Sequence, residues 1–146
     1  MDSIEFLELA DVMEIHVDQI RNYGGTTEVR DVGLLESAIE QPRSSFGGQF
    51  LHAFPYEMAA AYLFHVVKNH PFVDGNKRTG TVAALVFLSW HGVRIQAVPG
   101  ELSDLTLAVA TGTADKTAVA EFFRAHTAGS NPRQAGSSAK VDRSAD

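Results

Sequence analysis

Two long apolar segments separated by a polar loop constrain this sequence most strongly. The first covers residues 55–69 and the second covers residues 81–91, and each would be apolar around nearly its whole circumference as a helix. A helix of that kind is buried in a core rather than placed on a surface. We therefore predict an all-α fold built around a buried helix pair, with a short hairpin at most.

The loop between these segments concentrates polar chemistry. Residues 70–80 spell His-Pro-Phe-Val-Asp-Gly-Asn-Lys-Arg-Thr-Gly. A connection between two buried helices has no structural need for an imidazole, a carboxylate, an amide and two cations. We predict that this loop is the functional site and that Phe72 turns inward to anchor it.

The second half of the loop has the features of a phosphate site. The first backbone N–H groups of a helix are unpaired and carry the positive end of its dipole, so they bind anions well. Gly75 lets a ligand approach the backbone closely. Lys77 and Arg78 are unfavourable in a first helical turn unless an anion is bound there. We assign Gly75, Asn76, Lys77 and Arg78 to cofactor binding.

The first half of the loop supplies the reactive groups. Asp74 suits Mg²⁺, which proteins usually hold through one or two carboxylates together with substrate phosphates. His70 is the loop group whose ordinary pKa suits a general base near neutral pH. Phosphoryl or nucleotidyl transfer is the chemistry that fits, with His70, Asp74, Lys77 and Arg78 as the catalytic residues and Asp74 as the metal ligand.

The loop also resembles the signature of the Fic/Doc family, His-x-Phe-x-Asp/Glu-Gly/Ala-Asn-Gly/Lys-Arg. The matching positions are His70, Phe72, Asp74, Gly75, Asn76, Lys77 and Arg78. Further stretches are similar to the death-on-curing (Doc) branch, among them Tyr23-Gly24-Gly25, Arg30-Asp31 and the segment 101–106. The resemblance implies a helical bundle in which residues 43–54 form a flap that lays the target chain beside the active site.

Two positions differ from the AMP-transferring Fic enzymes. Those enzymes carry Gly where this chain has Lys77, and a second Arg where it has Thr81. Both differences are similar to Doc toxins, in which ATP binds in the reversed sense and the γ-phosphate faces the histidine. The resemblance therefore implies an ATP- and Mg²⁺-dependent protein kinase. Transfer of AMP to a protein hydroxyl is the alternative, and a non-catalytic anion-binding module is a third.

The resemblance also implies partners. Doc toxins phosphorylate a threonine of elongation factor Tu, which stops translation. They are neutralised by a Phd-like antitoxin whose C-terminal segment folds onto the toxin as a helix in a groove. We therefore expect elongation factor Tu as substrate and a separate Phd-like antitoxin as partner.

Composition narrows the classes of function. The chain has 146 residues, no cysteine and a formal net charge of −6. Disulfides and thiolate metal sites are excluded, and a cytoplasmic location is expected. The apolar runs are too short to cross a bilayer, so no membrane association is expected. The acidic charge disfavours direct nucleic-acid binding.

Helical periodicity and capping residues indicate the remaining elements. We expect helices at residues 4–23, 101–110 and 116–126, a helix capped by Asp31 and stopped by Pro42, and an extended segment at 93–98. His16 lies on the apolar face of the first helix, where we expect a core histidine rather than a catalyst. Residues 1–126 are predicted to form the domain and residues 127–146 a flexible tail.

Overall fold

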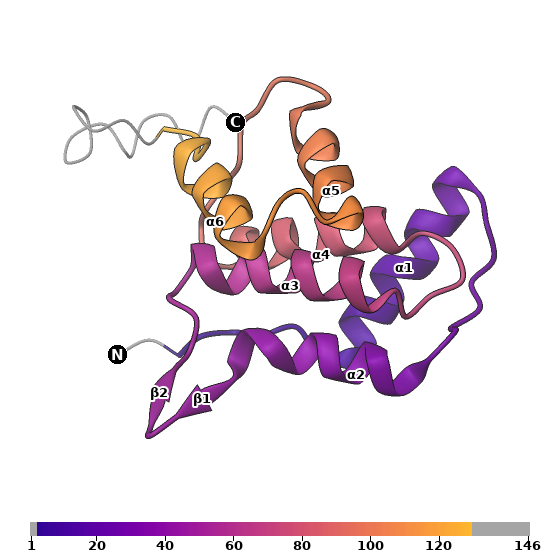
Figure 1. Ribbon diagram of the computed structural model, residues 1–146, viewed down its shortest axis with the longest axis horizontal. Coiled ribbons are helices and arrows are strands. Elements are labelled where there is room, and N and C mark those ends of the chain that lie inside the picture. The colour runs from indigo at the N-terminus through magenta and orange to yellow at the C-terminus, as the bar shows by residue number, and fades with distance from the viewer. Residues whose placement is uncertain (1–2, 130–146) are drawn as a thin grey trace.

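The predicted all-α class is confirmed by a computed structural model, which describes residues 3–129 (Figure 1). The described chain holds six α-helices, one 3₁₀ turn and one short hairpin. The helices are α1 (Leu9–Tyr23), α2 (Val32–Glu40), α3 (Tyr56–Asn69), α4 (Asn76–Trp90), α5 (Glu101–Thr111) and α6 (Lys116–Ala125); the 3₁₀ turn is η1 (Gln41–Arg43), and the strands are β1 (Ser45–Phe46) and β2 (Gln49–Phe50).

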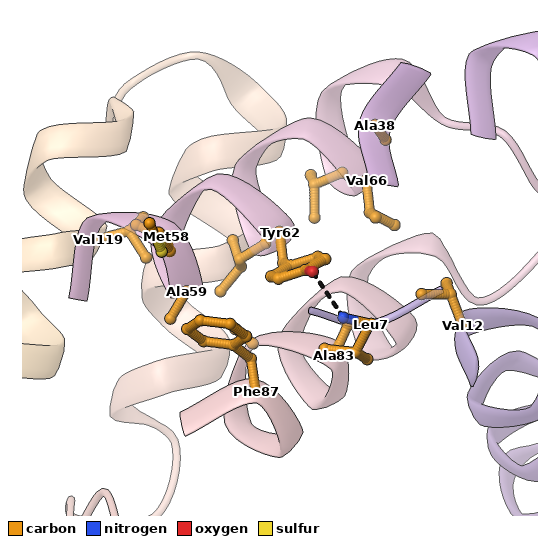
Figure 2. Packing of buried hydrophobic residues seen from close by; sticks show 14 of the residues in the cluster. Leu7, Val12, Ala38, Met58, Ala59, Tyr62, Val66, Ala83, Phe87 and Val119 are labelled. Atoms are coloured by element: carbon orange, nitrogen blue, oxygen red, sulfur yellow. Dashed lines mark hydrogen bonds between the residues drawn. The ribbon is translucent and has the colours of Figure 1, made fainter. Parts of the chain in front are cut away.

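Helix α3 is the centre of the fold. It packs against α2, α4, α5 and α6, and Figure 1 shows α2 on one side of it and α5 and α6 on the other. Tyr62 of α3 is fully buried, and its hydroxyl oxygen accepts a hydrogen bond of 2.8 Å from the backbone N–H of Leu7 (Figure 2). The buried helix pair expected from the sequence is thus α3 and α4, and the loop predicted to be the functional site joins them.

The first helix begins later than predicted. Residues 4–8 are not helical, and α1 starts at Leu9 because Glu8 caps it: the Glu8 N–H donates to the Asp11 carboxylate at 2.7 Å. Leu7 lies just before this cap and is fully buried against the core. The free energy gained by burying Leu7 in the non-helical segment 4–8 therefore exceeds the free energy that extending α1 over these residues would give. Helical spacing also predicts Met13 on the apolar face of this helix, but Met13 is 37% exposed.

The other predicted boundaries agree with the structure to within a residue or two. Asp31 caps α2 by accepting the Leu34 N–H at 2.9 Å, and Asp115 caps α6 by accepting the Ala118 N–H at 2.9 Å. Pro42 sits in η1, directly after α2. The hairpin forms within the predicted flap, with Ser45 paired to Phe50.

The segment after α6 packs on the domain. Only Ile95 of the predicted extended segment 93–98 forms a β-bridge, and its partner is Thr127. The Ala128 N–H donates to the Arg94 carbonyl at 2.7 Å. The domain contacts therefore continue through Ala128, past the predicted boundary, and the rest of the predicted tail, 130–146, lies outside the described residues. Between residues 3 and 129, no helix has the length and apolarity that crossing a membrane requires.

Candidate active site

His70 ends α3 in a strained conformation. Its backbone has a φ of 51°, the one positive φ at a non-glycine residue between residues 3 and 129. Side chains are rarely held in this region unless the surroundings impose it, and such residues cluster at functional sites. The His70 ring is exposed and makes no hydrogen bond to any described residue. The imidazole is therefore available to a ligand.

The connection between α1 and α2 holds this strained backbone in place. The side chain of Arg30 donates from Nε to the His70 carbonyl at 2.7 Å and from Nη2 to the Asn69 carbonyl at 3.0 Å. Its backbone N–H donates to the Pro71 carbonyl at 2.7 Å, and Val29 forms an antiparallel bridge with Phe72. Sequence reasoning assigned no role to Arg30, and the Arg30-Asp31 resemblance was the one signal that pointed to it.

Two buried side chains, those of Phe72 and Asn76, hold the centre of the loop. Phe72 is fully buried, as predicted. The Asn76 side chain closes the loop with two hydrogen bonds of 2.9 Å, accepting the Phe72 N–H and donating to the Phe72 carbonyl. Asn76 is only 5% exposed. Its amide side chain is therefore committed to the loop, and its contribution to a ligand would come from its backbone N–H.

Helix α4 begins with open backbone donors. Its N-cap is Gly75, which has no side chain to cap the helix, and the N–H groups of Asn76, Lys77 and Arg78 have no acceptor among the described residues. Gly75 has a φ of 82°, and a Cβ atom there would lie 3.1 Å from Ile20 Cδ1. These three open amides lie at the helix start where the sequence predicts that an anion binds.

Asp74 presents a carboxylate at the edge of this helix start. Its side chain is exposed, and Oδ2 accepts the Thr26 N–H at 2.9 Å. No cationic side chain from residues 3–129 forms an ion pair with it. The other oxygen therefore remains available to a hard cation, and the donor set fits Mg²⁺ bound together with phosphate oxygens.

His16 reaches the loop from α1. Its ring is 1% exposed, stacks on Phe72 with centroids 3.6 Å apart and planes 8° apart, and places Nε2 2.8 Å from the Asp74 carbonyl oxygen. Burial lowers the pKa of His16. A carbonyl oxygen can only accept, so the ring donates its Nε2–H to it. The expectation of a core histidine is confirmed, although this one lies against the site.

The two loop cations differ in their surroundings. Arg78 lies over the Tyr23 ring at 5.2 Å and donates to the Gly24 carbonyl at 3.3 Å, while its buried Nε has no partner among residues 3–129. The Lys77 side chain is exposed and has no hydrogen-bond partner in that same range. Donors of both side chains are therefore left for an anion.

A cavity of about 490 Å³ opens beside these cations. Both Lys77 and Arg78 line it, together with apolar and polar side chains of α1, α4 and α5. Thr81 lies in its wall and uses its hydroxyl internally, donating to the Lys77 carbonyl at 2.9 Å and contacting the Thr106 hydroxyl at 3.0 Å. The cavity gives a ligand held at the helix start room to extend along α4.

Comparison with known proteins agrees with this arrangement. The model of the Fic/DOC family matches residues 6–88. Toxin Doc of Mycolicibacterium smegmatis is 38% identical over 100 residues, which cover 67% of this chain and 77% of that protein. Protein kinase doc of Escherichia phage P1 is 33% identical over 114 residues, which cover 78% of this chain and 89% of that protein. The chain therefore belongs to the Fic/DOC family, in its Doc branch.

Proposed function

We propose that this chain is a Doc-type toxin that transfers the γ-phosphate of ATP to a serine or threonine hydroxyl of a translation factor, with elongation factor Tu as the expected acceptor. One observation carries the proposal: the three open amides at the start of α4 share one loop with the Asp74 carboxylate and the unpaired His70 ring. The relative named as a protein kinase supports the same reaction class.

Each group has a defined part in the reaction. The α4 amides, Lys77 and Arg78 bind and orient the phosphates. His70 accepts the proton of the attacking hydroxyl as the new oxygen–phosphorus bond forms and ADP leaves. Asp74 would hold Mg²⁺, which when bound neutralises phosphate charge. The Arg30 contacts keep the His70 backbone fixed, so the base stays in place during the transfer.

AMP transfer is the competing reaction, because other members of the Fic family perform it. The surroundings of Thr81 support the kinase instead. Threonine is uncharged, and the Thr81 hydroxyl is committed to Lys77 and Thr106, so this position offers a second phosphate neither a cation nor a free donor. Lys77, where AMP-transferring enzymes have glycine, adds bulk and charge at the helix start.

The position of the label on ATP separates the two reactions. The purified chain is incubated with elongation factor Tu and with ATP labelled at either the α or the γ position, and the mass of the acceptor is measured. The kinase predicts transfer of γ label and a phosphate-sized increment. Transfer of α label with a nucleotide-sized increment would reject it. His70→Ala should abolish transfer, whereas Lys68→Ala, at an exposed position in the last turn of α3, should leave it unchanged.

We also propose that a separate Phd-like antitoxin restrains this activity by laying a helical segment into a groove. The cavity lined by Lys77, Arg78 and Leu107 is one suitable place, because a segment there would cover the phosphate-binding cations. Expression of this chain alone should arrest growth, and co-expression of the neighbouring small reading frame should relieve the arrest. Harmless high-level expression without that partner would count against the proposal.

A further inference from the structure

His16 is a buried polar residue that the loop chemistry does not use. It lies on α1, 58 residues from Asp74 in sequence. Its two contacts in the loop are the face of Phe72 and the carbonyl oxygen of Asp74. This core histidine therefore touches both the buried ring that anchors the loop and the residue expected to hold the metal.

The hydrogen bond to Asp74 fixes one peptide plane. In a trans peptide the C=O and the following N–H point in opposite directions. Holding the Asp74 carbonyl on His16 therefore turns the Gly75 N–H away from α1. The Gly75 N–H has no acceptor among the described residues, and it immediately precedes the three open amides of α4.

The flat stack sets the direction of the bond. With its plane 8° from the plane of Phe72, the imidazole is restrained by a fully buried ring. Phe72 is itself held through both backbone groups by Asn76. The loop and α1 thus form one rigid unit in which the His16 N–H points at one atom.

We propose that His16 is a positioning residue for the phosphate site. By binding the Asp74 carbonyl, it orients the Asp74–Gly75 peptide, which joins the carboxylate expected to hold the metal to the three open amides of α4. This inference rests on the proposed function, because it concerns how well the loop binds a Mg²⁺–nucleotide complex.

Two substitutions separate the hydrogen bond from the ring stack. His16→Phe keeps a flat ring against Phe72 and removes the donor, whereas His16→Gln removes the ring and keeps an N–H donor. Val12→Ala is the control. Val12 is fully buried on the same helix, and its aliphatic side chain cannot make a hydrogen bond to the loop. It should lower stability without altering the loop.

Binding and loop exchange are both measured on the full chain. Calorimetry gives the affinity for Mg²⁺ with adenylyl imidodiphosphate, and hydrogen–deuterium exchange follows peptides covering residues 70–80. We expect His16→Phe to weaken binding about tenfold and to speed exchange of the loop, since one buried hydrogen bond is worth roughly that factor. His16→Gln should stay within about threefold of the wild type, and Val12→Ala should bind like the wild type.

Each other outcome has a defined meaning. Wild-type affinity and loop exchange in His16→Phe would overturn the inference, as would an equal loss of affinity in Val12→Ala. If His16→Phe does not fold, His16→Gln decides, because loss of binding in that folded variant would refute the role of the donor. If the wild type itself binds no nucleotide, the proposed function fails, and loop exchange still tests whether His16 holds the loop.

Discussion

Asn76 offers the sharpest test of how the site is built. The sequence alone places it in the phosphate cradle, but its side chain closes the loop through two hydrogen bonds of 2.9 Å to Phe72. Replacing Asn76 with alanine removes both partners at once. The Phe72 N–H and carbonyl are then left unpaired in the core, because Phe72 is fully buried and Asn76 is only 5% exposed.

The expected loss follows from those two groups. A buried backbone group left without its partner costs about 1–3 kcal/mol, and some relaxation of the loop is expected, so Asn76→Ala should lower the free energy of unfolding by roughly 2–4 kcal/mol. For a domain of this size, 1 kcal/mol corresponds to about 4 °C in Tm, so the midpoint should fall by about 8–16 °C. Asn76→Asp still accepts the Phe72 N–H but cannot donate to the carbonyl, so it should also destabilise.

Urea unfolding followed by circular dichroism measures this loss. The matched control is Lys77→Ala, one residue along the same loop, where the side chain is exposed and has no hydrogen-bond partner within residues 3–129. The control should leave stability within about 0.5 kcal/mol of the wild type while weakening nucleotide binding. Asn76→Ala with wild-type stability would refute the claim that this amide holds the loop together.

Two further predictions address the surroundings of the site, and a third concerns His65 on α3. Gly25 has a φ of +114°, and in Gly25→Ala the new Cβ would lie 2.8 Å from Asp74 Cβ. The resulting displacement of the Asp74 carboxylate should raise the Mg²⁺ concentration needed for nucleotide binding, which titration calorimetry measures. Arg30→Met should slow phosphate transfer about ten- to hundredfold by loosening the His70 backbone, at little cost in stability, which steady-state kinetics and thermal melts would separate. Burial, aided by the nearby Lys116 ammonium, lowers the pKa of His65 to about 4 from its ordinary 6.5. The unfolded state therefore binds the proton more tightly, and the contribution of His65 to stability should be complete above pH 6.5 and fall as the pH drops toward 4. Urea midpoints at pH 7.5 and 5 should consequently differ less in His65→Gln than in the wild type.

Much of the fold follows from local signals in the sequence. The all-round apolar character of residues 55–69 and 81–91 predicts the buried pair α3 and α4, and it does so because burial depends on the composition of each segment itself. Asp31 and Asp115 mark helix starts correctly because a cap contacts a backbone N–H only three residues away. The functional loop is recognisable for the same reason, since its reactive groups lie within eleven consecutive residues, 70–80.

What the sequence by itself determined is therefore the helix pair, the capped helices and the chemical identity of the loop. Only the tertiary structure decided how that loop is held. His16 and Arg30 reach it from 58 and 40 residues away, and Leu7 leaves the first helix to pair with Tyr62, 55 residues on. No local sequence pattern predicts these contacts. Each one depends on which distant backbone groups remain unpaired after the helices pack, and only the folded chain decides that.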